Sequence, residues 1–72
     1  MTGMILVFKT TVTKNSEVKK LKVHLDALLP TSKWNFDLAN CDNILRVDTA
    51  ENKSGLIIHT MNENGFDCIE LE

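Results

Sequence analysis

Hydrophobic positions along the 72 residues change period several times, which predicts alternating strands and helices. Residues 4–12 are almost continuously apolar and β-branched, as in a buried central strand. The next apolar residues recur at helical spacing: Val18, Leu21, Leu25 and Leu28. Ser16 is the expected N-cap of this helix, and Pro30 is expected to end it.

The second half of the chain predicts a hairpin, a second helix and a last strand. Trp34, Phe36 and Leu38 alternate with smaller or polar residues, and the turn-forming segment 40–43 follows. Leu45 and Val47 then alternate with charged residues, as in the second strand of a hairpin.

A helix is expected over 54–64 and a strand over 66–71. Gly65 stands between them, at the position past a helix end where a left-handed backbone favours glycine.

The resulting order, strand-helix-strand-strand-helix-strand, fills the chain and leaves no room for a linker. We therefore expect one domain over 1–72 of the α+β class, a ferredoxin-like βαββαβ sandwich. Its four-stranded antiparallel sheet is expected to have the order 4-1-3-2, with the two helices on one face.

The element order and the segment 61–67 (Met-Asn-Glu-Asn-Gly-Phe-Asp) resemble a heavy-metal-associated domain, the module of copper chaperones and metal-pumping ATPases. The resemblance extends from Met4 to Leu71. It implies the same sandwich fold and a first loop that binds soft metal through a Cys-x-x-Cys pair.

The cysteine pair of that family is missing from this chain. Alignment through the first helix places Lys14 and Glu17 at the two cysteine positions and Val12 at the preceding methionine. An ammonium does not bind Cu(I) at neutral pH, and a single carboxylate is a hard ligand. The resemblance therefore implies a degenerate domain whose family metal residues do not carry over, and we expect no cofactor.

The two cysteines of the chain, Cys41 and Cys68, are the remaining soft ligands. We expect Cys41 in the hairpin and Cys68 in the last strand, on opposite edges of the sheet. Three strand spacings separate these edges, roughly 14 Å, which is too far for a shared metal or a disulfide within one molecule. A copper or zinc site between two molecules, using Cys41 or Cys68, stays open as the alternative function.

Other functions find little support in the residues. His24 and His59 lack a neighbouring ligand cluster, no nucleophile-base pair is visible, and the glycines are isolated, so we expect no enzymatic activity. Phe8, Trp34 and Phe36 are expected to face the core rather than an open RNA-binding surface.

Composition limits the classes of partner and the cellular compartment that we expect for this chain. The net charge of −2 gives no footprint for nucleic acid, and no apolar run approaches the roughly 20 residues of a membrane span. With no signal-peptide pattern at the start, we expect a cytoplasmic protein.

The first strand is apolar on both faces, so part of it should remain uncovered. If Leu6 and Phe8 face the helices, Ile5 and Val7 face outward, with Ile44 nearby on the third strand. An exposed apolar patch on a small domain indicates an interface. The predicted function is a non-enzymatic interaction module that binds a protein partner or a second copy of itself through the open sheet face.

Overall fold

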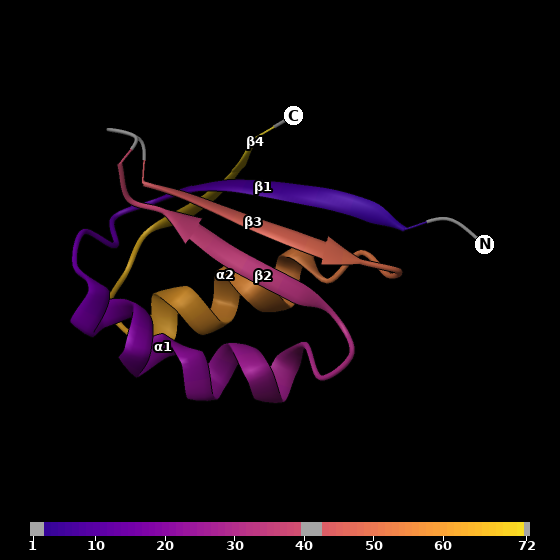
Figure 1. Ribbon diagram of the computed structural model, residues 1–72, viewed down its shortest axis with the longest axis horizontal. Coiled ribbons are helices and arrows are strands. Elements are labelled where there is room, and N and C mark those ends of the chain that lie inside the picture. Colours follow the sequence, from indigo (N-terminus) through magenta and orange to yellow (C-terminus); the bar gives the residue numbers. More distant parts are fainter. Residues whose placement is uncertain (1–2, 40–42, 72) are drawn as a thin grey trace.

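The computed structural model describes residues 3–39 and 43–71, and within these ranges strands and helices alternate. The elements are β1 (Met4–Thr10), α1 (Asn15–Leu28), β2 (Lys33–Asp37), β3 (Ile44–Thr49), α2 (Ser54–Glu63) and β4 (Cys68–Leu71). The strands form one antiparallel sheet in the order β2-β3-β1-β4, and the predicted α+β class is confirmed (Figure 1).

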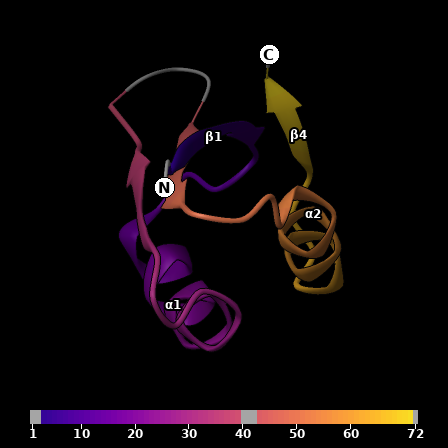
Figure 2. The ribbon, with the colours of Figure 1, turned by 90° about the vertical axis from the view of Figure 1, so that its right-hand side faces the viewer.

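In the described part of the chain, both helices lie on the same face of the sheet. Figure 2, which looks at the molecule from its side, shows α1 on the side of β2 and α2 beneath β4. The core lies between the helices and the sheet. Its buried members from the regular elements are Leu6, Phe8, Leu21, Leu25, Leu45, Val47, Ile57, Met61 and Cys68.

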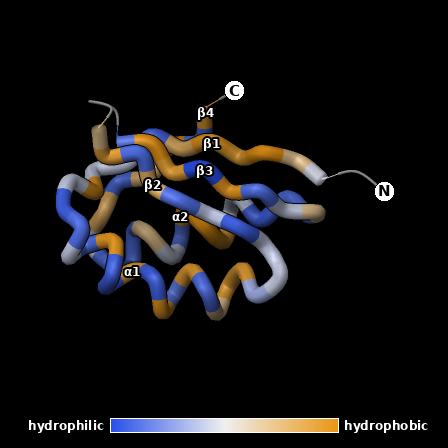
Figure 3. Tube along the Cα trace, in the orientation of Figure 1, coloured by the Kyte–Doolittle hydropathy of each residue, from blue (hydrophilic) through white to orange (hydrophobic). Residues whose placement is uncertain are grey.

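The pairing register determines which residues share a face, because residues directly opposite in an antiparallel sheet point to the same side. Leu6 is opposite Val47 and Phe8 is opposite Leu45, and all four are buried against the helices. The intervening residues of the strands therefore point to the open face. Figure 3 shows that β1 is apolar along most of its length, whereas β2 and β3 include more polar positions.

The first strand is shorter than the predicted range 4–12, since it ends at Thr10. The Thr10 hydroxyl donates to the carbonyl oxygen of Asn43 at 2.7 Å and accepts from the backbone N–H of Val12 at 3.2 Å. These bonds turn the chain away from the sheet, yet Val12 remains fully buried in the core. The apolar residues thus continue past the end of the strand because Val12 packs in the core, although it lies outside the sheet.

The predicted N-cap of the first helix, Ser16, is wrong. Lys14 is the N-cap, with an extended backbone (φ −128°, ψ 147°), and Ser16 already lies inside α1. The backbone N–H of Lys14 donates to the Glu17 carboxylate at 3.2 Å, as in the acidic half of a capping box. A carboxylate three residues after the cap therefore decides the start of the helix.

The second helix ends as the sequence predicts. Gly65 has a φ of 87°, a left-handed conformation that side chains with a Cβ adopt at a cost. Its N–H donates to the carbonyl of Asn62 at 3.0 Å, and the N–H of Phe66 donates to that of Met61 at 3.0 Å. This pair of bonds is a Schellman motif, and it directs the chain into β4.

Replacing Leu25 by Ala tests the helix-sheet core. The Leu25 side chain is fully buried between α1 and the sheet, so its truncation leaves a cavity. We expect the free energy of unfolding to fall by about 2–5 kcal/mol, measured by urea denaturation. Leu56, exposed on α2, is the control, and Leu56→Ala should change stability far less. Equal losses for the two variants would contradict the described packing.

Candidate functional site

The open face of the sheet is a grid of three rows that run across the strands. The first row contains Lys33, Asp48 and Ile5. The second contains Asn35, Arg46, Val7 and Leu71. The third contains Asp37, Ile44, Lys9 and Ile69.

The grid is divided lengthwise into an apolar half and a charged half. The apolar half lies on β1 and β4 and includes Ile5, Val7, Ile69 and Leu71, with Lys9 of β1 as the charged exception. Ile5 is 59% exposed, Ile69 61% and Leu71 40%, while Val7 is half-buried between them. Within the described part of the chain, neither helix covers these side chains. We call these four residues the apolar strip.

Two members of the apolar strip, Ile69 and Leu71, were missed by sequence reasoning. The pair Thr10 and Cys68 is buried, so the residues of β4 that alternate with Cys68 face outward. Glu70 shares the inner side with Cys68 and remains exposed because β4 is an edge strand. In the sequence, the charge of Glu70 obscured the alternation of inward and outward side chains along β4. A carboxylate is normally expected on the solvent side and not on the inner side of a sheet.

The prediction that Ile44 forms part of an exposed patch is wrong. Its register places it on the open face, but only 5% of it is exposed. Ile44 lies on the central strand β3, directly between Lys9 on β1 and Asp37 on β2. Both neighbours point to the same face as Ile44, and a lysine stem is long enough to lie over an adjacent side chain. The other two predicted interface residues, Ile5 and Val7, do face outward.

The charged half lies on β2 and β3 and includes both signs. Arg46 contacts the carboxylate of Asp37 at 3.8 Å, with both side chains partly exposed. A shallow groove of about 360 Å³ runs along this half and is lined by Ile5, Lys33, Trp34, Asn35, Arg46 and Asp48. The open face thus joins an apolar strip to a groove with mixed charges, the combination found at protein interfaces.

The loop that would hold metal in the resembled family has a structural task here. The Glu17 carboxylate accepts from the backbone N–H of Thr13 at 2.9 Å, from the Thr13 hydroxyl at 3.3 Å and from the backbone N–H of Lys14 at 3.2 Å. The hydrogen bond from the Thr13 backbone is the main cause that lowers the pKa of Glu17. The carboxylate at the second family position is therefore engaged in holding the loop.

The same loop is fastened to the start of β4. The backbone N–H of Thr11 donates to the carbonyl of Asp67 at 3.2 Å, and the backbone N–H of Asp67 donates to the Thr11 hydroxyl at 2.9 Å. Hydrogen bonds to Glu17 and to Asp67 thus hold the first loop in place at both of its ends.

The thiol of Cys68 is enclosed in the core. Only 6% of the residue is exposed, and burial, with a smaller contribution from the Glu70 charge, raises the pKa of Cys68 to about 12. Such a thiol behaves as a small hydrophobic side chain, because metal binding and nucleophilic attack need the thiolate. Cys41, the other predicted candidate ligand, lies outside the described residues.

Metal-ligating side chains are scattered over residues 3–39 and 43–71. No group of three or more His, Cys, Asp or Glu side chains in these ranges is arranged to hold an ion. Both histidines are exposed, and the Nε2 atom of His59 lies 3.7 Å from a Glu63 carboxylate oxygen. Neither helix of the described chain is long and apolar enough to cross a membrane.

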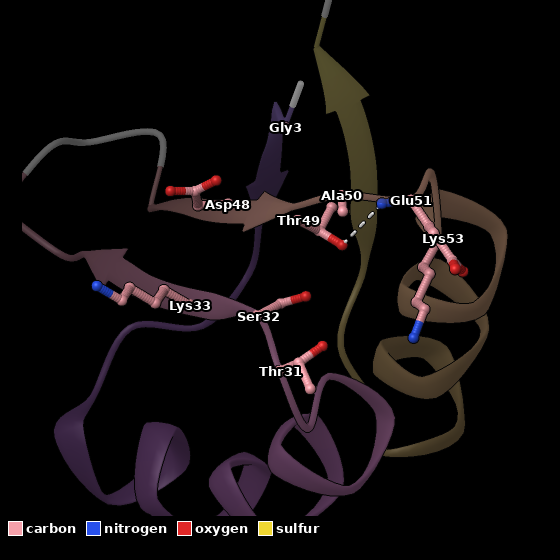
Figure 4. Close-up of a pocket in the computed structure, with 9 residues that line it drawn as sticks. All are labelled: Gly3, Thr31, Ser32, Lys33, Asp48, Thr49, Ala50, Glu51 and Lys53. Atoms are coloured by element: carbon pink, nitrogen blue, oxygen red, sulfur yellow. Dashed lines mark hydrogen bonds between the residues drawn. The ribbon is translucent and has the colours of Figure 1, made fainter. Parts of the chain in front are cut away.

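A polar hollow of about 290 Å³ lies at the end of the sheet where β1 begins, between the α1–β2 and β3–α2 connections (Figure 4). The Lys53 ammonium donates to the carbonyl of Leu28 at 3.2 Å and so closes the end of α1. The Thr49 hydroxyl accepts from the backbone N–H of Glu51 at 3.3 Å. These contacts join the elements of the scaffold, and no cysteine or histidine is among the described lining residues.

Comparison with known proteins adds no assignment to this geometry. No family model, no curated protein and no solved structure matches the chain.

The burial of Cys68 predicts very slow alkylation. In a Cys41→Ser variant at pH 8, a pKa of about 12 leaves only about one thiol in 10⁴ as thiolate. We expect iodoacetamide to modify the native protein far more slowly than the urea-unfolded protein, measured by mass spectrometry. Similar rates for the two states would show that Cys68 is accessible.

The role of Glu17 predicts a pH-dependent contribution to stability. Its pKa is lowered in the folded chain from the ordinary value of 4.5, so this contribution is present above about pH 4.5 and is lost as acid protonates the folded carboxylate. We expect Glu17→Ala to lower the melting temperature at pH 7 and to differ less from wild type at pH 3. Glu63→Ala, on exposed α2, is the control. A difference that stays constant from pH 7 to pH 3 would argue against capping by the carboxylate.

Proposed function

We propose that this chain is a non-enzymatic interaction module on a ferredoxin-like scaffold, a degenerate relative of the heavy-metal-associated domains that has exchanged metal binding for protein binding. The single observation that supports this proposal best is the apolar strip. Ile5, Ile69 and Leu71 are strongly exposed side by side with Val7 on one flat face. Exposure of this kind costs free energy in water unless a partner covers it.

The chemistry of the first loop and of the core supports the loss of metal binding. Lys14 and Glu17 stand at the family ligand positions, and the Glu17 carboxylate is held by the backbone of the same loop. Cys68 is buried with a raised pKa. The alternative, a copper or zinc carrier with a site between molecules, would need Cys68 to leave the core or Cys41 to act without it. No observation favours that alternative.

The partner that fits the open face is a protein surface with an apolar centre and charges of both signs at its margin. The apolar strip would form the desolvated centre of the contact. Beside it, Arg46 and Asp48 present opposite charges on β3. Nucleic acid fits poorly, because the chain has a net charge of −2.

Lysine substitutions in the apolar strip test the interaction. Ile69→Lys and Leu56→Lys are matched variants, since Ile69 is 61% exposed on the open face and Leu56 is 54% exposed on α2. We expect proteins captured by the wild type from its native cells to be retained by Leu56→Lys and lost with Ile69→Lys, as measured by quantitative mass spectrometry. Identical capture by the two variants would contradict a role for the strip.

Titration with Cu(I) under reducing conditions tests the loss of metal binding in the same proteins. We expect no binding that competes with a chelator of high affinity, in the wild type or in Cys41→Ser. Stoichiometric binding that Cys41→Ser or Cys68→Ser removes would replace the proposal by the metal-carrier alternative.

A further inference from the structure

A second surface, distinct from the apolar strip, is the outer edge of β2. In the described sheet β2 is the last strand, paired on one side with β3 and on the other side with no strand. Alternate residues of such a strand direct their backbone N–H and C=O groups away from the sheet. An edge of this kind is a template for another extended strand unless it is protected.

We propose that the β2 edge binds the β2 strand of a second copy of this chain, antiparallel, with Asn35 on the two-fold axis. This arrangement would join two sheets into one continuous sheet with the helices of both copies on the same side. It does not rest on the proposed function, whose main support is the apolar strip of β1 and β4, although Lys33, Trp34 and Asn35 of β2 also line the groove of the open face.

The order of residues along β2 is complementary to itself in this register. With Asn35 on the axis, Lys33 lies opposite Asp37 of the partner subunit, and the same pair repeats across the axis. On the other face of the strand, Trp34 lies opposite Phe36 of the partner subunit, which also occurs twice. Opposite charges and aromatic pairs directly across an antiparallel ladder are stabilising combinations.

Neighbouring registers lose this match. With Trp34 on the axis, Lys33 lies opposite Asn35 of the partner subunit and gains no charge pair. With Phe36 on the axis, Asn35 lies opposite Asp37 of the partner subunit, and Lys33 again gains no acidic neighbour. Charged residues normally protect an edge strand from pairing. Here the two charges permit one register of self-pairing and disfavour the others.

Three of the side chains that would meet the second copy already have contacts within their own chain. The Trp34 indole N–H donates to the Asp26 carboxylate at 3.1 Å, and the rings of Trp34 and Phe36 are 5.9 Å apart in an edge-to-face arrangement. Asp37 is held near Arg46 at 3.8 Å. Pre-ordered side chains lose little conformational freedom on association, which favours binding by so short a strand.

The other free edge, β4, is a poorer site for a second copy. A pairing that brings Ile69 opposite Leu71 of the partner subunit places Glu70 opposite Glu70 of the partner subunit. Like charges directly opposite are destabilising. That register of β4 is therefore disfavoured, and β4 has no basic residue that could form a charge pair like the one between Lys33 and Asp37.

Charge exchange within β2 tests the proposal by sedimentation velocity over roughly 10 µM to 1 mM, a range suited to a small interface. We expect the wild type to form a dimer, and Lys33→Asp or Asp37→Lys to weaken it about tenfold, because each creates like-charge pairs twice across the axis. The double variant Lys33→Asp/Asp37→Lys should restore the dimer. Lys20→Asp, on the exposed surface of α1, controls for net charge. Circular dichroism verifies that each variant is folded.

A disulfide across the axis provides a second measurement. In a Cys41→Ser background, Asn35→Cys should form a disulfide-linked dimer on mild oxidation, since directly opposite Cα atoms are about 4.5–5.5 Å apart in an antiparallel pair, within disulfide reach. Lys20→Cys should not.

Three results would overturn the proposal. One is a wild type that stays monomeric together with an Asn35→Cys variant that cross-links no faster than Lys20→Cys. Another is a dimer that is unaffected by the single charge reversals. The third is a dimer that Ile69→Lys removes and Lys33→Asp retains, which would assign self-association to the open face. Loss of captured partners with Ile69→Lys concerns the proposed function alone, so the two proposals can fail separately.

Discussion

The central strand β1 is apolar on its inner face and, at Ile5 and Val7, on its outer face as well, and this arrangement shapes the rest of the molecule. It lies between β3 and β4, with Leu6 and Phe8 turned toward the helices. In the described chain the helices lie on that face only, so the outward residues of β1 join those of β4 in a strip that water covers. A two-layer domain of this size has no third layer to bury them. The topology thus leaves this face open, and the apolar residues at these positions of β1 and β4 make part of it an exposed apolar surface.

In the first loop, a side chain can either bind a ligand or hold the backbone by hydrogen bonds, but it cannot do both at once. Thiolates that bind a soft metal must be free of other strong contacts. In this chain the Glu17 carboxylate is occupied by N–H groups of its own loop, and the loop is joined to Asp67 by hydrogen bonds in both directions. The fold therefore gains a defined helix start from these hydrogen bonds.

The features that depend only on local patterns of apolar, polar and glycine residues could be predicted from the sequence. The element order, the outward direction of Ile5 and Val7, and the left-handed Gly65 could all be predicted, because each depends on local patterns that few arrangements satisfy. Three features could not. Ser16 lost the N-cap position to Lys14 because a carboxylate contact selected the helix start.

The other two failures involve long-range neighbours. Ile44 is buried although its register places it on the open face, between Asp37 of the adjoining strand and Lys9 of β1, which is distant in the sequence. Ile69 and Leu71 face outward because β4 pairs with β1 in one particular register, which the charge of Glu70 disguised. Candidate interface residues thus depend on pairing across the sheet, whereas helix and strand positions depend mainly on periodicity.

The strand order also determines how many partners one assembly can hold. Because β2 and β4 are opposite edges of the sheet, a dimer joined through β2 would place its two apolar strips near the far ends of an extended platform. Each strip would remain open, so the dimer would be bivalent. A partner that itself has two binding sites would then gain avidity, since its second contact forms at a high effective concentration. Weak self-association of this small domain would in that way raise its apparent affinity for partners that have two binding sites.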